Sequence, residues 1–215
     1  MFYAKYLKRP LDLILSSLGL ILLSPLFAIL ALWIKLDSKG PVFFQQKRVG
    51  KEKKFFSIYK FRTMRIDAPQ DTPTHMLKDP AVFITRSGRL LRKTSLDELP
   101  QLINIYRGDM SVIGPRPALW NQDDLIAERD KYKGINGWSA NDIRPGLTGW
   151  AQINGRDELE IPVKAKMDGE YVQRMSFLFD ARCFFDTIAT IFKSDGIIEG
   201  GTGELSRKKG CASEK

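Results

Sequence analysis

Two adjacent carboxylates, Asp97 and Glu98, stand in a polar gap between apolar runs of the 215-residue chain. Basic residues lie on both sides of them: Arg86, Arg89, Arg92 and Lys93 precede the two acids, and Arg107 and Arg116 follow. Neighbouring carboxylates can hold a divalent metal or attack a phosphorus atom, and arginines can bind phosphate oxygens. Asp97 and Glu98, called the acid pair below, are therefore the candidate reaction centre.

The same stretch also fits the start of a helix. Ser95 and Glu98 have the spacing of a capping box, and a helix dipole favours an acid in the first turn. Pro100 would then fall at the fifth helical position, where it must distort the hydrogen-bond ladder or shorten the helix. Local sequence alone leaves both interpretations of the acid pair open.

A conformationally restricted arginine follows the acid pair. Pro115 and Pro117 restrict the backbone on both sides of Arg116. This side chain therefore loses little conformational freedom when its fork binds a phosphate or a carboxylate. The alternative is a stiff turn that carries a surface arginine.

A loop at residues 143–156 combines three glycines with groups suited to contacting a nucleotide. Glycines let backbone amides approach a ligand, and a tryptophan ring can stack on a base. The candidates for weaker contacts in this loop are Arg144, Trp150, Gln152, Asn154 and Arg156.

The elements that must position these groups begin with a membrane segment. Residues 11–34 are almost wholly apolar, which is enough to cross a hydrocarbon core about 30 Å thick. The run is longer than the core of a cleaved signal peptide, and no small-residue cleavage site follows it. The segment should therefore stay attached to the chain.

The break and the flanks of this segment indicate its topology. Pro25 crowds the carbonyl of Ile21 and predicts a kink, and the Ser24 hydroxyl can satisfy part of the freed backbone. Lysines and arginines lie on both flanks, as expected at a cytoplasmic face. A helix-break-helix hairpin that enters and leaves by one face explains both features, and an ordinary kinked spanning helix is the alternative.

The remaining patterns predict an α+β fold that is mainly helical. β-prone runs at residues 41–46 and 55–61 predict a small β-hairpin, whose interleaved phenylalanines and lysines suit a surface of anionic head groups. Residues 99–106 have helical spacing that ends at Gly108, and the charged segment 121–133 predicts a solvated helix. The amphipathic segment 177–192 lies either on the bilayer or in the core.

Charge and composition narrow the class of partner. The formal charge of +9 indicates an anionic partner: nucleic acid, anionic lipid or a phosphorylated small molecule. The apolar N-terminal run argues against nucleic acid. Two distant cysteines, Cys183 and Cys211, and the single histidine, His75, offer neither a disulfide framework nor a zinc motif.

Several of these stretches together resemble the monotopic phosphoglycosyl transferases, bacterial sugar transferases that move a sugar phosphate from a nucleotide diphosphate sugar to polyprenol phosphate. The resemblance runs from about Lys5 to Phe192 and matches the small, minimal form of the family, with no polytopic segment before the core. Each motif is modest alone, but their order and spacing are specific. The motifs are the basic leader, the membrane run with Ser24 and Pro25, and segments 59–64, 95–98, 108–111, 114–117 and 144–156.

The resemblance implies a role for each matching residue. Asp97 would be the nucleophile and Glu98 its partner, and both would bind Mg²⁺ as the cofactor. The residues that would line the phosphate site are Lys60, Arg92, Arg116 and, as a further acidic position, Asp168. The chain would then comprise a re-entrant membrane helix at residues 1–40, a catalytic domain with amphipathic interfacial helices at 41–199, and a disordered tail at 200–215.

The implied reaction transfers a sugar phosphate from a UDP-sugar to undecaprenyl phosphate, releases UMP and passes through a sugar-phosphoryl aspartate. Anionic lipids and a second copy of the chain in a homodimer are further partners, and nucleic acid is not. The expected location is the bacterial inner membrane, with the active site on the cytoplasmic face. One rival is a non-enzymatic membrane scaffold that binds anionic lipid or other glycan enzymes. The other is a glycosyl transferase that would release UDP instead.

Overall fold

The computed structural model of the chain describes residues 2–69, 80–134, 137–155 and 159–193. It is mainly helical, with one antiparallel hairpin and one short parallel strand pair, so the predicted α+β class is confirmed. The elements are α1 (Lys8–Leu22), α2 (Ser24–Asp37), β1 (Phe43–Val49), β2 (Phe55–Phe61), α3 (Arg86–Lys93), α4 (Gln101–Arg107), β3 (Ser111–Ile113), α5 (Asp123–Arg129), β4 (Gly146–Thr148), α6 (Trp150–Ile153), α7 (Ile161–Arg174) and α8 (Phe177–Lys193).

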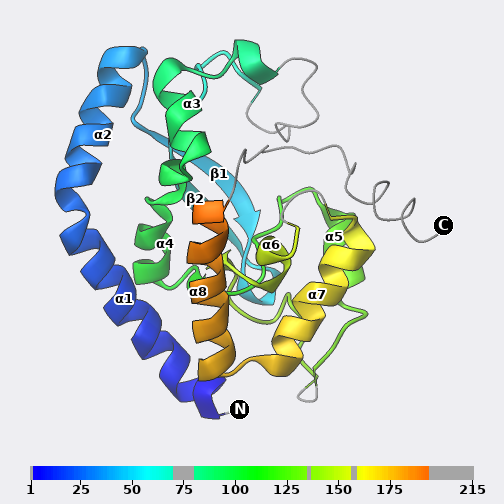
Figure 1. Cartoon of the computed structure of the whole chain (residues 1–215). Coiled ribbons are helices and arrows are strands. Elements are labelled where there is room, and N and C mark those ends of the chain that lie inside the picture. The colour runs from blue at the N-terminus through cyan, green and yellow to red at the C-terminus, as the bar shows by residue number, and fades with distance from the viewer. Residues whose placement is uncertain (1, 70–79, 135–136, 156–158, 194–215) are drawn as a thin grey trace, which may run out of the picture.

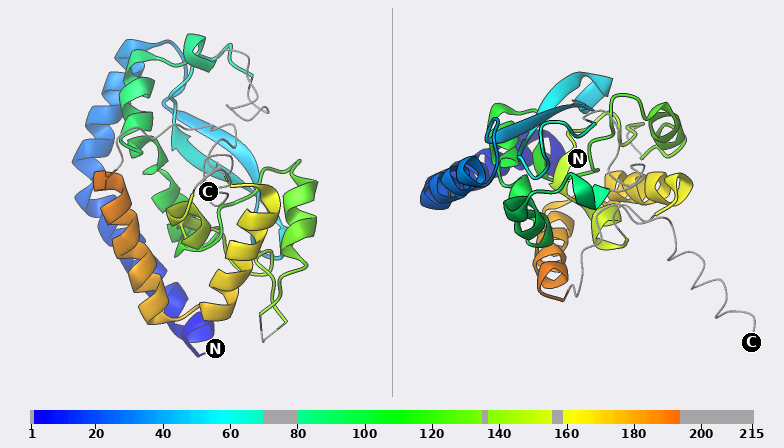
Figure 2. Two further views of the ribbon diagram at one scale, coloured as in Figure 1. Left: turned by 45° about the vertical axis from the view of Figure 1, so that its right-hand side comes forward. Right: turned by 90° about the horizontal axis from the view of Figure 1, so that it is seen from above.

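Helices α1 and α2 run along one side of the molecule, and α5 and α7 lie on the opposite side (Figure 1). Helix α1 packs on α4, α2 packs on α3, and α5 packs on α7. Helix α8 begins near the start of α1 (Figure 2), where Lys8 forms an ion pair with Asp180. The β1–β2 hairpin starts beside α2, and its turn reaches the segment around α5, since the Glu52 amide donates to the Asn141 carbonyl.

The predicted break at Ser24 and Pro25 is confirmed. The stretch Tyr3–Leu22 and helix α2, called the bent helix pair below, meet at an angle of 60°. The Ser24 hydroxyl donates to the Ile21 carbonyl at 2.8 Å, which satisfies the backbone group that Pro25 displaces. In the described part of the chain no single helix is long and apolar enough to cross a membrane, whereas the two halves of the pair reach that length together.

Polar side chains of α1 attach the bent helix pair to the rest of the protein. Both guanidinium ends of Arg9 donate to the last carbonyls of α4, at Ile105 and Tyr106, where a cation also opposes the negative end of the helix dipole. Asp12 accepts bonds from the Ser111 hydroxyl at 3.0 Å and the Val112 amide at 2.9 Å.

The basic leader makes a second attachment, at α8. Lys8 forms a buried ion pair with Asp180, and the hydroxyl groups of Tyr3 and Tyr171 donate to the same carboxylate at 2.6 and 2.7 Å. The first half of the bent helix pair therefore contacts both the middle of the chain and helix α8.

The hairpin supplies core residues more than lipid-facing ones. Phe61 is only 1% exposed and packs with Leu30, Ile34 and Leu91 beneath α2. Of the hairpin phenylalanines, Phe43 and Phe55 keep exposed rings. The expected alternation of rings at head-group level therefore fails at Phe61, because the approach of α2 buries that end of β2.

Helices α5 and α8 each have one face that is buried in the protein and one that is exposed. Helix α5 is not simply a solvated helix, because Leu125 and Arg129 are buried against α7. In α8, Phe179 and Cys183 lie in the core. The exposed apolar side chains of α8 are Phe177, Leu178, Phe184, Phe185 and Ile188. The core interpretation is therefore confirmed for one face of this helix, and the bilayer interpretation stays a prediction for the other, exposed face.

Glycines close the parallel strand pair β3–β4, which links residues 111–113 to 146–148. A Cβ atom on Gly146 would lie 2.1 Å from the Gly114 nitrogen, and one on Gly149 would lie 2.0 Å from the Gly114 oxygen. The glycines predicted to approach a ligand instead allow two backbone segments to approach each other. This contact fixes the position of the loop that carries Arg116.

Candidate active site

The acid pair lies in a short 3₁₀ turn, Leu96–Glu98, between α3 and α4. Ser95 precedes the turn in a left-handed conformation with φ of 55°, and its side chain makes no capping bond. The capping-box interpretation is therefore wrong. Pro100 is the physical reason, because it has no amide hydrogen and cannot continue an α-helix from residue 96, so α4 begins after it, at Gln101.

One ammonium group connects the two acids. The Nζ atom of Lys60, on β2, lies 2.7 Å from Oε1 of Glu98 and 3.9 Å from Oδ2 of Asp97. The side chain of Asp97 is almost fully buried, and that of Glu98 is 16% exposed. The hairpin therefore delivers a cation to the turn that holds the acid pair.

Arg116 reaches the same carboxylate from the other side, with Nη2 3.4 Å from Oε1 of Glu98. Burial raises the pKa of Glu98, but the charges of Lys60 and Arg116 outweigh that effect and lower the pKa to about 2. Glu98 is consequently an ionised group held by two cations at neutral pH. The arginine between the two prolines therefore faces the acid pair and does not simply extend from a surface turn.

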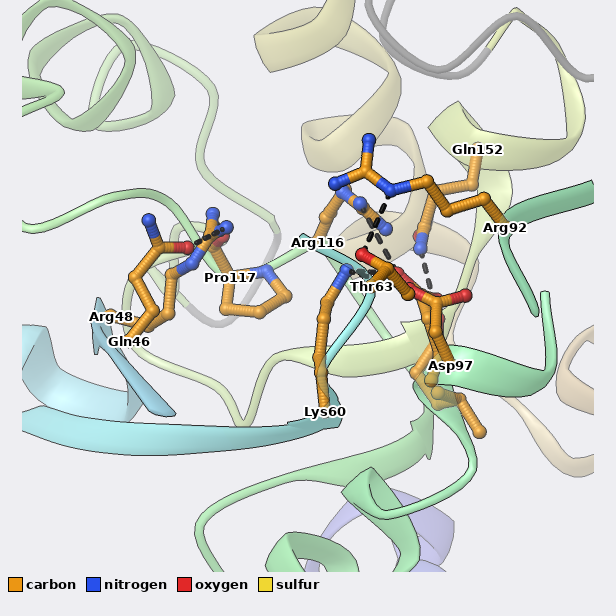
Figure 3. A network of polar contacts seen from close by, with 11 residues as sticks. Gln46, Arg48, Lys60, Thr63, Arg92, Asp97, Arg116, Pro117 and Gln152 are labelled. Carbon is orange, nitrogen blue, oxygen red and sulfur yellow. Dashed lines mark hydrogen bonds and ion pairs between the residues drawn. The ribbon is translucent and has the colours of Figure 1, made fainter. Parts of the chain in front are cut away.

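Arg92, in the last turn of α3, is a third cation that lies near the acid pair (Figure 3). Its Nε atom donates to the Thr63 hydroxyl at 2.9 Å, which fixes the guanidinium beside the end of the hairpin. Lys60, Arg92 and Arg116 come from three separate elements, and the fold brings them to one acidic turn. Such a group of cations suits a ligand with several phosphate oxygens.

The loop residues proposed for nucleotide contacts are dispersed. Gln152 lies near the acid pair in Figure 3 and donates to the Leu147 carbonyl at 3.1 Å. Trp150 packs against Phe179 and donates to Glu170, so its ring is partly covered by α7 and α8. Asn154 donates to the Trp150 carbonyl and Arg144 to the Gly108 carbonyl. Arg156 lies outside the described residues.

Asp168 lies on α7 in a buried ion pair with Arg129 of α5, at 2.6 Å. Burial raises the pKa of Asp168, and the Arg129 guanidinium offsets part of that rise. Arg129 also donates to the Arg116 carbonyl at 2.8 Å. Asp168 is therefore linked to the site through Arg129. The sequence did not indicate this role for Arg129, because segment 121–133 contains many charged residues.

Ser24 and Pro25, the remaining predicted residues, lie at the bend of the bent helix pair and apart from the acid pair in sequence. Thr63 and Arg48 are further site residues that the sequence did not single out. The Thr63 hydroxyl accepts a hydrogen bond from Arg92, and the positive charge of Arg48 contributes to the low pKa of Glu98. No local pattern marks either residue, because their roles depend on the hairpin meeting α3 and the loop at 114–117.

Comparison with known proteins identifies a family. The model of the family described as bacterial sugar transferase matches residues 3–194. The uncharacterized sugar transferase EpsL of Bacillus subtilis is 38% identical over 191 residues, which are 89% of this chain and 90% of that protein.

Two longer relatives carry more specific names. The UDP-glucose:undecaprenyl-phosphate glucose-1-phosphate transferase of Escherichia coli is 40% identical over 192 residues, covering 86% of this chain and 40% of that protein. The UDP-N-acetylgalactosamine-undecaprenyl-phosphate N-acetylgalactosaminephosphotransferase of Aeromonas hydrophila is 36% identical over 200 residues, covering 89% of this chain and 45% of that protein. The chain therefore spans less than half of each of these two proteins.

The names of these two relatives specify different sugars, so similarity at this level does not select one. From the family match over nearly the whole described chain and from its named relatives, this protein belongs to the bacterial sugar transferase family and is a phosphoglycosyl transferase.

Proposed function

We propose that this protein transfers a sugar phosphate from a UDP-sugar to undecaprenyl phosphate, with Asp97 as the nucleophile. The observation that carries the proposal is a pair of buried carboxylates beside shared cations. Glu98 contacts both Lys60 and Arg116, and Asp97 lies next to it, 3.9 Å from the same Lys60 ammonium. A carboxylate placed among phosphate-binding cations supports a role for Asp97 in attack on a phosphorus atom.

The proposed chemistry has two displacements at the same phosphorus. A carboxylate oxygen of Asp97 attacks the β-phosphorus of the UDP-sugar, and the bond to the bridging oxygen breaks, so UMP leaves with that oxygen. A phosphate oxygen of undecaprenyl phosphate then attacks the sugar-phosphoryl aspartate. This second step restores the Asp97 carboxylate and forms undecaprenyl diphosphate sugar.

Lys60, Arg92 and Arg116 would counter the negative charge of the diphosphate and of the lipid phosphate. Two anions repel each other, and cations held in position before the reaction need no reorganisation when charge moves in the transition state. Because Glu98 is ionised and bound to two of these cations, it would also limit their movement when no substrate is present.

The acid pair also fits Mg²⁺ by the chemistry of its donors. Mg²⁺ is commonly bound through one or two carboxylates together with substrate phosphates. Within the residues that the structure describes, no group of three or more acidic, histidine or cysteine side chains could hold a metal, so the protein would contribute Asp97 and Glu98 and the substrate would contribute the rest. When bound, the ion would neutralise charge on the diphosphate.

The proposed location is the cytoplasmic face of the bacterial inner membrane. The support is the bent helix pair, which carries many exposed apolar side chains, together with the apolar face of α8. Surfaces of this size and character mark contact with a membrane or a partner. The basic residues on both flanks of the pair favour anionic lipid and a re-entrant path, which would keep the acid pair near the phosphate of a lipid acceptor.

The test is release of nucleotide by purified full-length protein in nanodiscs with undecaprenyl phosphate, Mg²⁺ and a panel of UDP-sugars. We expect UMP with at least one sugar, and we expect Asp97→Asn to abolish turnover without loss of membrane association. A UDP-sugar labelled at the β-phosphate should label the wild-type protein, and Asp97→Asn should prevent it. UDP as the product would indicate a glycosyl transferase, and no nucleotide from any sugar would favour a scaffold.

A further inference from the structure

The backbone that carries Arg116 is held by two other arginines. The Arg116 carbonyl accepts a hydrogen bond from Nη2 of Arg129 at 2.8 Å. The next carbonyl, that of Pro117, accepts one from Nη1 of Arg48 at 3.1 Å. Figure 3 shows Arg48 beside Pro117, with Arg116 and Lys60 on the side of the acid pair.

These two hydrogen bonds restrict backbone rotation that the two prolines do not fix. Proline fixes φ at residues 115 and 117 but not ψ. Because the peptide unit is planar, ψ of a residue sets the direction of its own carbonyl. Pro117 already confines ψ of Arg116 to the extended region, so the bond from Arg129 narrows that dihedral further. The bond from Arg48 restrains ψ of Pro117, which neither proline ring fixes.

Both arginines are themselves fixed. Arg129 is 4% exposed, and its Nε and Nη2 atoms lie 2.8 and 2.6 Å from Oδ2 of Asp168. Arg48 sits on β1, and its Nη2 atom donates to the Gln46 amide oxygen at 2.7 Å. One restraint thus comes from the α5–α7 pair and the other from the hairpin that also carries Lys60.

We propose that Arg48 and Arg129, called the carbonyl clamp below, are positioning residues that hold Arg116 in register with Glu98 and with the substrate phosphates. Asp168 belongs to the clamp by keeping Arg129 in place. The inference rests on the proposed function, since it assigns Arg116 to a phosphate of the reacting substrate. On this proposal the buried Arg129–Asp168 pair positions Arg116 for the reaction and also joins helices α5 and α7.

A double-mutant cycle separates this task from a structural one. The variants are Arg129→Lys, Arg48→Lys and Arg116→Ala, alone and combined, measured by steady-state UMP release and by thermal unfolding. Lysine keeps the charge but cannot donate from a planar fork. In otherwise wild-type protein we expect each lysine variant to lower kcat about 10- to 100-fold, the range that a small misplacement near a reacting group produces.

The decisive comparison is made in Arg116→Ala protein. If the clamp acts through Arg116, Arg129→Lys and Arg48→Lys should then lower the rate less than 2-fold further. A loss of the same size with and without Arg116 would overturn the proposal. So would full activity in both single lysine variants.

Two features keep the test conclusive. If Arg129→Lys unfolds the protein, Arg48→Lys tests the clamp from the other carbonyl, because Arg48 lies on a different element and is only partly buried. Lys53→Met is a matched control, since it removes an exposed ion pair with Asp130 at the end of α5 and should leave the rate within 2-fold. Failure of the proposed function itself shows differently, as wild-type protein that releases no UMP.

Discussion

The Nζ atom of Lys60 lies 2.7 Å from Glu98 and 3.9 Å from Asp97, so one cation from the hairpin faces both members of the acid pair. This relationship joins two segments almost forty residues apart in sequence. It also means that the protonation of Glu98 and the charge beside Asp97 depend on the same side chain.

Replacing Lys60 with methionine should therefore impair catalysis in a pH-dependent way. Loss of the ammonium removes a main cause of the low Glu98 pKa, so that pKa rises and the acid limb of the rate profile moves to higher pH. We expect a loss of about 100-fold in kcat at neutral pH, typical for removal of one preorganised charge donor. The measurement is UMP release as a function of pH, and Lys60→Arg, which keeps the charge, should retain more activity.

Acid should weaken the fold through Glu98. Its folded pKa of about 2 lies below the ordinary value of 4.5, so the contribution to stability is complete above about pH 4.5 and disappears as the pH falls toward 2. Thermal unfolding of wild type and Glu98→Gln should therefore differ most near neutrality and converge in acid. A gap in Tm that stays constant between pH 7 and pH 3 would contradict this assignment.

The topology of the bent helix pair can be tested by thiol labelling. Cysteines are placed at Phe2 and at the exposed Lys39, because a side chain at Gly40 would lie 2.1 Å from the Arg62 guanidinium. With Cys183 and Cys211 replaced by alanine, we expect an impermeant reagent to reach neither position in intact cells and both after lysis. Labelling at Lys39→Cys from outside would show that the segment crosses the membrane.

The bend itself should determine that topology. Pro25→Ala restores an amide donor and removes the crowding of the Ile21 carbonyl, so the 60° angle between the halves should relax. In that variant we expect Lys39→Cys to become reactive from outside the cell in a measurable fraction of molecules. Ser24→Ala, which loses only the 2.8 Å bond to Ile21, is the milder comparison and should keep the wild-type labelling pattern.

Asp12 should stabilise the fold although it lies in a largely apolar helix. Asp12→Ala leaves the Ser111 hydroxyl and the Val112 amide without their acceptor in a buried position. Unsatisfied buried donors cost about 1–3 kcal/mol each, so the two together correspond to a fall in Tm of roughly 4–24 °C for a protein of this size. Thermal unfolding in detergent measures it, and Asp67→Ala, which loses an exposed pair with Arg65, should change Tm by less than about 2 °C.

The sequence predicted features that depend on neighbours along the chain. Pro25 and Ser24 give the break, Gly108 ends α4 with φ of 97°, and the β-prone runs pair as the hairpin. The acid pair and its cations could also be proposed, since their residue types suit phosphate chemistry wherever the fold places them. Lys60, however, was assigned to the site only by resemblance to a family.

Features that depend on distant contacts were missed or misread. Ser95 and Glu98 match a capping box, but no local rule revealed that Pro100 would separate a 3₁₀ turn from α4 and leave Ser95 left-handed. Arg129 looked like one charge among many in a solvated helix, because its burial arises only when α7 packs on α5. Contacts of this kind, between segments far apart in sequence, cannot be predicted from local periodicity.

The attachment of α1 has a consequence for how this protein must be handled. Lys8, Arg9 and Asp12 bond to α8, α4 and β3, so a lipid environment that binds the outer surface of α1 favours the folded state of all three elements. If the protein lies in the bilayer as proposed, the bilayer is a ligand of the native state by thermodynamic linkage, and its composition should shift Tm. Deleting the first 22 residues would not yield a soluble enzyme but one with unpaired groups in its interior.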